Sequence, residues 1–315
     1  SFIKKANGTF AILFMISGEN KLYAIKRDSP LVLGIGDKEY YLASDIYAFS
    51  DKTNKAVFFD DNEFAVINRD GYKFFNKDGF HVEKKIDEFE WTAEEETKES
   101  FDHYMMKEIK EQPLTSSRLI KSFNGIQKDK INTFAKLIKE YKKIVFVACG
   151  TSYHAALIGS ILLTKLGYNA RAVIASELES FVSFDNETLT IAISQSGETM
   201  DVVTVLKNAK DKGSKILSIV NVPYSTIQRL SDIFIEILAG QEICVASTKT
   251  FTNQVIIMLE IARRLSYEIN IEEISEKIQE TIAANEEIIK ELAKKLYQEN
   301  DIFVLGKGIS YPVAR

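Results

Sequence analysis

The second half of the sequence alternates short apolar stretches with segments of helical periodicity, and this pattern limits the folds open to the chain. Strands are predicted at 143–148, 170–174, 189–193, 215–219 and 233–237, with helices at 153–166 and 200–212 between them. Strands that alternate with helices form parallel sheets with helices packed on their faces. From about residue 124 the sequence therefore predicts an α/β domain with a doubly wound parallel sheet.

The first 85 residues are predicted to be rich in β-strands. Candidate strands are 8–16, 21–26, 39–43, 56–59, 63–68 and 72–75, separated by turn-forming stretches of Gly, Asn, Asp and Ser. The alternation of Phe64 with Val66 and of Tyr72 with Phe74 suits a sheet with one buried face. This part is interpreted as scaffold. The charged stretch 86–122 is interpreted as a linker, in which a short helix from Phe101 to Gln112 ends at Pro113.

Bulk composition excludes several classes of protein. At 315 residues the chain is long enough for two domains. Its net charge of -5 argues against a partner such as nucleic acid or an anionic membrane surface. The longest apolar run, 11–16, is too short to span a membrane, and the N-terminus lacks the pattern of a signal peptide. With only two cysteines, Cys149 and Cys244, a cytoplasmic location is expected.

Two hydroxyl-rich loops follow predicted strands and precede predicted helices. They are Cys149-Gly150-Thr151-Ser152 and Ser194-Gln195-Ser196-Gly197-Glu198-Thr199. Free backbone N–H groups at a helix N-terminus, together with the helix dipole, favour a bound anion. A single loop of this kind is usually only a helix cap. Two of them at the carboxyl ends of parallel strands, where open α/β sheets bind ligands, predict a cradle for a small phosphorylated ligand.

A third polar loop, 239–249, is a further candidate wall for the same site. Its segment Val245-Ala246-Ser247-Thr248 offers hydroxyls just before a helix that is predicted to begin near Thr250. Lys249 could attract a phosphate, although a lysine in a polar loop is more often simply exposed.

The end of the sequence repeats an earlier pattern. After a helical stretch rich in Glu and Lys, 302–311 follows the design of 144–153, and Gly150, Ser152 and Tyr153 recur 158 residues later as Gly308, Ser310 and Tyr311. Such self-similarity predicts the first strand of a second α/β module. We therefore expect the natural protein to continue beyond Arg315.

These motifs together resemble the glucosamine-6-phosphate synthase family, the glutamine–fructose-6-phosphate aminotransferases. The resemblance rests on the two loops, on Gly240 to Lys249, and on supporting matches at 28–34, 42–45, 103–113 and 305–308. The family has a glutaminase domain of the Ntn type followed by two sugar-isomerase (SIS) domains. By this resemblance 1–85 is the later part of the glutaminase domain, 86–122 a linker, 123–270 the first SIS domain, and 271–315 connecting helices and the start of the second.

The resemblance also implies site residues and partners. Fructose 6-phosphate, or the product glucosamine 6-phosphate, would lie against Cys149, Gly150, Thr151, Ser152, Ser194, Gln195, Ser196, Thr199, Val245 and Ser247. The hydroxyls of the second loop would hold the phosphate, and Val245 and Ser247 would line the sugar. Family members need no cofactor or metal here, use glutamine through the glutaminase domain, and assemble as dimers. We therefore expect a homodimer.

The sequence departs from the family in its chemical groups. The family's glutaminase uses an N-terminal cysteine, whereas position 1 here is Ser1. The lysine, glutamate and histidine that the family uses on the sugar would lie beyond Arg315. This chain is therefore expected to supply a substrate cradle and none of the catalytic residues.

Other candidate residues are weaker. Cys149 could be a nucleophile, but a thiol at a strand end is usually buried packing. His154 lies in the first turn of a predicted helix, where a solvated or capping role is expected, and His81 and His103 lack metal-ligand partners at useful spacing.

Two other functions remain open from the residues alone. The chain could be a SIS-type phosphosugar-binding regulator, although such proteins usually carry a helical DNA-binding domain. It could also be a stand-alone phosphosugar isomerase, for which Glu198, Glu242 and His154 are the available acid and base candidates.

Overall fold

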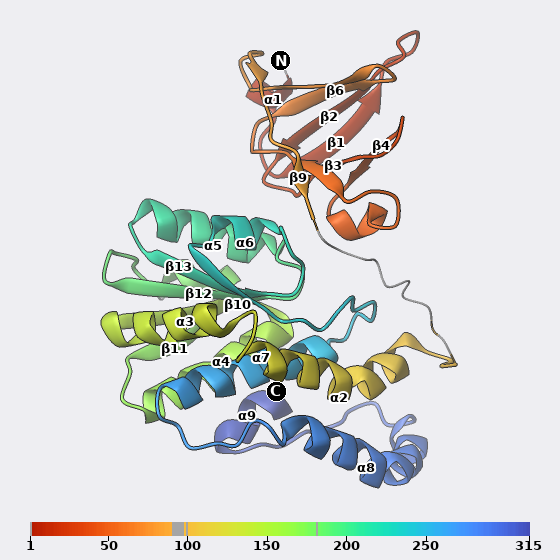
Figure 1. Cartoon of the computed structure of the whole chain (residues 1–315). Helices are drawn as coiled ribbons and strands as arrows, with labels where there is room; N and C mark the ends of the chain where they lie inside the picture. The colour runs from red at the N-terminus through yellow and green to blue at the C-terminus, as the bar shows by residue number, and fades with distance from the viewer. Residues whose placement is uncertain (1, 90–97, 99, 181) are drawn as a thin grey trace. The chain divides into compact units, whose positions relative to one another are not determined.

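The computed structural model describes residues 2–89, 98, 100–180 and 182–315 (Figure 1). The chain divides into two compact units, Ser1–Thr97 and Lys98–Arg315. The charged stretch predicted as a linker is therefore divided between them, and its positions 90–97 and 99 lie outside the described residues.

The first unit contains two antiparallel sheets. In spatial order, one consists of β1 (Phe10–Met15), β2 (Leu22–Arg27), β6 (Phe64–Asn68), β7 (Gly71–Phe75) and β8 (His81–Val82). The other consists of β4 (Tyr40–Ala43), β3 (Val32–Ile35), β5 (Lys55–Phe58) and β9 (Asp87–Glu88). Short helices α1 (Phe2–Lys5) and η1 (Ile46–Phe49) complete the unit. Both sheets contribute side chains to one hydrophobic cluster, which includes Leu33, Val57 and Phe74.

The predicted β-rich character of this unit is confirmed, but two details of the prediction are wrong. The strands β3, β8 and β9 were not expected, because each is short and carries little alternation. In β6 the buried residues are Ala65 and Ile67, while Phe64 and Val66 are only half-buried. The register explains this choice of face, because Ala65 pairs with the buried Phe74 of β7 and paired residues point to the same side.

The second unit is built on a five-stranded, fully parallel sheet. In spatial order the strands are β11 (Ala170–Ile174), β10 (Lys143–Ala148), β12 (Thr188–Ser194), β13 (Lys215–Val220) and β14 (Ile233–Glu236). All five lie where the sequence predicted them. The chain moves from β10 to one side and then returns to the other side, so the strand order reverses between β10 and β12. Open α/β sheets bind their ligands at such a switch point.

Helices cover both faces of this sheet, as Figure 1 shows. On one face are α3 (Lys128–Glu140), α4 (Gly150–Lys165) and α7 (Lys249–Arg264), and on the other are η2 (Ala175–Ser180), α5 (Met200–Asp211) and α6 (Thr226–Leu230). Strand β10 shows why both faces need cover: Ile144 and Phe146 point into one hydrophobic cluster and Val145 and Val147 into the other. The predicted doubly wound α/β fold is confirmed.

Helix α2 (Tyr104–Ser122) corrects the prediction that a helix ends at Pro113, since the helix continues for a further nine residues. A proline lacks the N–H that would bond to the carbonyl four residues earlier. Here the Gln112 side chain replaces that donor, because its Nε2 donates to Ile109 O at 3.2 Å. Beyond the proline, Leu119 and Ile120 are buried in the main cluster with α7. This part of the predicted linker is therefore an integral part of the second unit.

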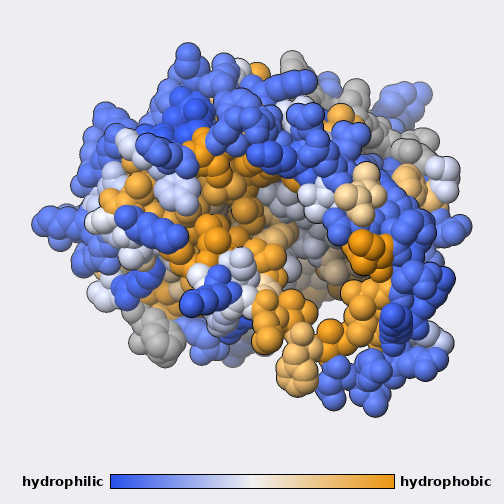
Figure 2. Space-filling model, turned by 90° about the horizontal axis from the view of Figure 1, so that it is seen from below, coloured by the Kyte–Doolittle hydropathy of each residue, from blue (hydrophilic) through white to orange (hydrophobic). Residues whose placement is uncertain are grey.

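The C-terminal part of the chain carries exposed apolar residues. It contains the long helix α8 (Ile274–Leu296), the turn η3 (Gly308–Ser310) and the short helix α9 (Tyr311–Ala314). Figure 2, seen from the side of α8, shows hydrophobic residues gathered around a hollow. The strand predicted near 302–305 does not form in the described structure, and these four residues are exposed. The turn after it does form, with Gly308 at φ +61° where Gly150 has φ +55°.

Candidate functional site

The first loop joins β10 to α4. Cys149 is the N-cap residue in an extended conformation, and α4 begins at Gly150 with a positive φ of +55°. The Ser152 side chain is nearly buried, and its Oγ accepts a hydrogen bond from Gln254 Nε2 of α7 at 3.0 Å. Because that bond occupies a lone pair of Ser152, the hydroxyl hydrogen of Ser152 is available to donate to a ligand oxygen.

The second loop joins β12 to α5 and is held by its own hydroxyl groups. Ser194 Oγ accepts from the Gly197 backbone N–H at 3.0 Å and lies 3.1 Å from Thr199 Oγ1. Ser196 Oγ accepts from the Glu198 backbone N–H at 3.1 Å. Gly197 has φ +68°, and a Cβ on it would lie 2.0 Å from Ser225 Oγ, so both the conformation and the space require glycine.

The third loop, 239–248, approaches the same place from the end of β14. Glu242 holds it together, because its Oε1 accepts from the backbone N–H of Thr248 at 2.9 Å and of Thr250 at 3.2 Å. Ser247 Oγ donates to Glu242 Oε2 at 3.2 Å. Val245, at the tip of the loop, is fully exposed.

These three loops enclose a pocket of about 450 Å³. All ten predicted site residues line it: Cys149, Gly150, Thr151, Ser152, Ser194, Gln195, Ser196, Thr199, Val245 and Ser247. Its remaining lining residues are Ile193, Glu242, Cys244 and Ala246. The pocket lies at the switch point between β10 and β12, so the position follows the general rule for open α/β sheets.

The N-termini of two long helices, α4 and α5, open at this pocket. Within the described part of the chain, neither Cys149 nor Thr199 makes a side-chain cap hydrogen bond to its helix. The first-turn N–H groups thus lack a side-chain acceptor, and both helix dipoles place partial positive charge at the pocket. Hydroxyls and backbone N–H groups at such a place form a binding site for an anion such as phosphate.

Helix α2 supports the third loop, a role that the sequence interpretation missed. Glu108, which is 2% exposed, accepts from the backbone N–H groups of Ile243 at 2.7 Å and Cys244 at 3.1 Å. Glu111 Oε2 accepts from Lys249 Nζ at 2.7 Å. Both glutamates belong to the 103–113 segment, which contributed to the family resemblance. The sequence therefore marked this segment, but it did not indicate that the two glutamates hold the third loop.

The expectation that Lys249 is exposed is wrong. Lys249 is 1% exposed and begins α7, and its ammonium group pairs with Glu111. A buried lysine is stable only with such a partner. Its ammonium charge is therefore paired with the Glu111 carboxylate of α2.

The titratable candidates have environments that do not suit nucleophilic or base chemistry. Burial raises the pKa of the Cys149 thiol above its ordinary value of 9.0. Burial, and then the positive charge of Arg315, lower the pKa of His154, which is absent from the described lining of the pocket. The Glu198 carboxylate is occupied by the Thr226 backbone N–H at 2.7 Å. In the described ranges, no group of three His, Cys, Asp or Glu side chains is arranged to hold a metal ion.

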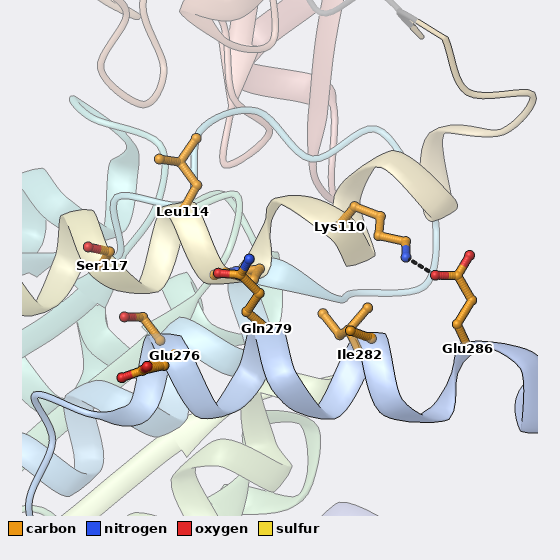
Figure 3. Close-up of a pocket in the computed structure, with 10 residues that line it drawn as sticks. Lys110, Leu114, Ser117, Glu276, Gln279, Ile282 and Glu286 are labelled. Carbon is orange, nitrogen blue, oxygen red and sulfur yellow. Dashed lines mark hydrogen bonds and ion pairs between the residues drawn. The ribbon is translucent and has the colours of Figure 1, made fainter.

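A larger pocket of about 590 Å³ lies between α2 and α8 (Figure 3). Lys110 of α2 pairs there with Glu286 of α8, and Glu276 also lines the space. Two carboxylates against one ammonium group make this pocket unfavourable for a phosphate. The smaller, hydroxyl-lined pocket is the better candidate for an anionic ligand.

Comparisons with known proteins agree with this geometry. Residues 137–262 match the SIS domain family. The chain is 39% identical over 331 residues to the glutamine–fructose-6-phosphate aminotransferase (isomerizing) of Thermococcus kodakarensis, covering 99% of this chain and 54% of that protein. The protein of the same name from Clostridium tetani is 37% identical over 334 residues, with coverage of 99% and 54%. The chain thus spans about half the length of the curated relatives it matches.

A solved structure shows the same relationship. The C-terminal domain of glucosamine-fructose-6-phosphate aminotransferase from Francisella tularensis matches with a TM-score of 0.59 and 32% sequence identity, over 69% of this chain and 66% of that chain. Among the described residues, no helix is long and apolar enough to cross a membrane. The chain therefore contains a SIS domain and is homologous, over its whole length, to the glutamine–fructose-6-phosphate aminotransferases.

Proposed function

We propose that this chain binds fructose 6-phosphate as part of an aminotransferase that makes glucosamine 6-phosphate from this sugar phosphate and glutamine. One observation carries the proposal: two hydroxyl-rich loops and two helix N-termini converge on one pocket at the switch point of a SIS domain. A ligand with a phosphate at one end and hydroxyl groups along its length matches that lining.

The pocket residues divide into two groups by what they offer. Ser194, Ser196 and Thr199 cluster at the N-terminus of α5 and would hold the phosphate, with Gln195 beside them. Thr151 and Ser152, with the backbone around Cys149 and Gly150, form the opposite wall. Val245 and Ser247 of the third loop would line the sugar.

The pocket side chains are suited to holding a ligand rather than to moving its protons. Ketose-to-aldose isomerisation requires a base that transfers a proton between adjacent carbons. The pocket offers hydroxyls, one amide and two thiols whose pKa values are raised, and the Glu242 carboxylate already accepts several hydrogen bonds from its own loop. We therefore propose that the groups for chemistry come from the rest of the whole protein, which would also supply the glutamine site. We also propose that the whole protein is a homodimer and that it acts without a metal or cofactor.

The geometry favours this proposal over a stand-alone isomerase. Of the three acid or base candidates for that activity, Glu198 is turned to the Thr226 backbone and His154 is not among the described lining residues. Glu242 lines the pocket but serves its loop. A phosphosugar-binding regulator would use the same pocket. If the whole protein binds the sugar phosphate but has no transferase activity, that result would favour the regulator.

Calorimetric titration with fructose 6-phosphate and glucosamine 6-phosphate tests the proposal. We expect saturable binding by the wild-type chain. We expect Ser196→Ala and Thr199→Ala each to weaken it about tenfold or more, because a hydrogen bond to a charged acceptor contributes about 1.5–3 kcal/mol. A folded wild-type chain that binds neither sugar phosphate overturns the proposal.

A further inference from the structure

The third loop, 239–248, forms the third wall of the pocket, and its hydrogen bonds come largely from carboxylate side chains. Between the end of β14 and the start of α7 the loop forms no strand or helix of its own, so it lacks the repeated backbone hydrogen bonds of such an element. Two carboxylates serve as acceptors instead: Glu242 from within the loop, and Glu108 from α2. Glu242 accepts from the backbone N–H groups of Thr248 and Thr250. Glu108 accepts from those of Ile243 and Cys244, and its second oxygen accepts from Thr248 Oγ1 at 3.5 Å.

Glu108 ties the middle of this loop to helix α2, whereas Asn221 holds the start of the loop through Ala239 N and Gly240 O. Glu108 Oε1 accepts from both Ile243 N and Cys244 N, residues that follow it by 135 and 136 positions. Glu108 is buried, and one turn later Glu111 pairs with Lys249 at the start of α7. Helix α2 thus fixes both ends of the segment that carries Val245 and Ser247.

We propose that Glu108 is a positioning residue that holds the third wall against the sugar part of the ligand without touching the ligand. This inference rests on the proposed function, because it assigns the sugar end of the ligand to that wall. Glu108 is outside the pocket lining, while Cys244, Val245 and Ser247 are part of it. Loss of the Glu108 carboxylate leaves the backbone N–H groups of Ile243 and Cys244 without their acceptor, and the wall then lacks a fixed position.

The phosphate part of the pocket is independent of this support. The second loop is held by Ser194 Oγ and the Gly197 N–H, and Ser152 is held by Gln254. These bonds involve β12, α4 and α7 rather than α2. A change at Glu108 is therefore expected to affect the two ends of a sugar phosphate unequally.

Binding of fructose 6-phosphate and of inorganic phosphate distinguishes the sugar end of the pocket from the phosphate end. For Glu108→Gln we expect the Kd of fructose 6-phosphate to rise about tenfold, because the two backbone N–H groups then bond a neutral oxygen in place of a charged one. Inorganic phosphate, measured by its competition with fructose 6-phosphate, is expected to keep its affinity within about twofold, because its own hydrogen bonds are unchanged. Glutamine retains one acceptor oxygen, so Glu108→Ala is expected to have the larger effect. Equal losses for both probes, or unchanged sugar-phosphate binding, overturn the inference.

Glu260→Gln is the matched control for removal of a buried carboxylate. Glu260 is fully buried on α7 and pairs with Arg263 and Arg264, both at 2.6 Å. We expect this variant to lose stability while its ratio of sugar-phosphate to phosphate affinity stays that of the wild type. If the ratio changes equally in this control, the effect at Glu108 is one of general stability and the inference fails.

Alkylation of the two cysteines tests the inference without any ligand. Cys244 lies in the third wall and Cys149 in the opposite one, so each reports on its own loop. The Glu108 carboxylate also raises the pKa of Cys244, so the labelling rates are compared on the plateau at high pH where both thiols are fully ionised. There Glu108→Gln is expected to accelerate iodoacetamide labelling of Cys244 several-fold and to leave Cys149 unchanged. If the wild-type chain binds no sugar phosphate but Cys244 responds in this way, the proposed function fails while the support by Glu108 stands. Normal binding by the wild type with no change at Cys244 overturns the support alone.

Discussion

The hydroxyl groups of Ser194 and Thr199 lie 3.1 Å apart, one at the end of β12 and the other at the N-cap of α5. The two hydroxyls differ in what else they bond. Ser194 Oγ also accepts the Gly197 N–H, whereas Thr199 makes no cap bond to its helix in the described structure. Ser194 therefore shapes the loop, and Thr199 is available to a ligand.

Substitution separates these two roles. Thr199→Val keeps the shape of the side chain and removes its bond to Ser194, so we expect fructose 6-phosphate binding to weaken about tenfold and the unfolding free energy to fall by about 1 kcal/mol or less. Ser194→Ala leaves the Gly197 N–H unpaired, and we expect a loss of about 1–3 kcal/mol. Calorimetry and urea unfolding measure the two effects. Thr133→Val, at a half-buried threonine of α3 outside the pocket, is the control. Equal stability losses in the Ser194 and Thr199 variants would contradict this division.

Gly197 provides a second prediction, because a side chain there meets both a conformational and a steric obstacle. For Gly197→Ala we expect a loss of about 2–4 kcal/mol, combining a positive φ with overpacking. Gly167→Ala is the matched control, since Gly167 has φ +89° and open space around its Cβ position. It should lose only about 1 kcal/mol. In the Gly197→Ala background, Ser225→Gly removes the clashing atoms and is expected to recover part of the loss in thermal unfolding. If both glycine variants lose the same stability, the close contact with Ser225 is unimportant.

The sequence was sufficient to predict the sheet of the second unit and the place of the pocket. Five apolar stretches became β10 to β14, because parallel strands buried on both faces leave a clear apolar signal. The loops after β10 and β12 came together because the carboxyl ends of parallel strands share one edge.

The contacts made by α2 were beyond the reach of such reasoning. Pro113 indicated a helix end, but the Gln112 side chain supplies the missing donor to Ile109 O. Lys249 was expected to be exposed, and its burial depends on Glu111, which lies 138 positions earlier in the chain. Both cases involve a specific side-chain partner, and neither periodicity nor composition carries information about such a partner.

The thiols in the pocket provide a prediction about pH. Burial raises the pKa of Cys149, and burial followed by the Glu108 carboxylate raises the pKa of Cys244. The reactive thiolate of each is therefore scarcer at neutral pH than in an ordinary cysteine, and alkylation should accelerate as pH rises past 9.0, the ordinary value. Mass spectrometry of iodoacetamide-labelled peptides follows both sites. Saturating fructose 6-phosphate is expected to protect both, and a rate plateau below pH 9 would contradict the burial of the thiols.

The ion pair between Lys249 and Glu111 leads to the last prediction. Lys249→Met keeps most of the side-chain volume and removes the positive charge. Among the ion pairs found in the described residues, Glu111 then keeps only the one with Lys107, at 3.5 Å. Breaking a buried pair costs about 3–5 kcal/mol, and because the Glu111 side chain is 25% exposed to water we expect about 3 kcal/mol or less. Urea unfolding measures this loss. Lys139→Met, on the surface of α3, is the control and should change the unfolding free energy by less than about 0.5 kcal/mol. A Lys249→Met variant as stable as this control would show that the pair does not hold α2 to α7.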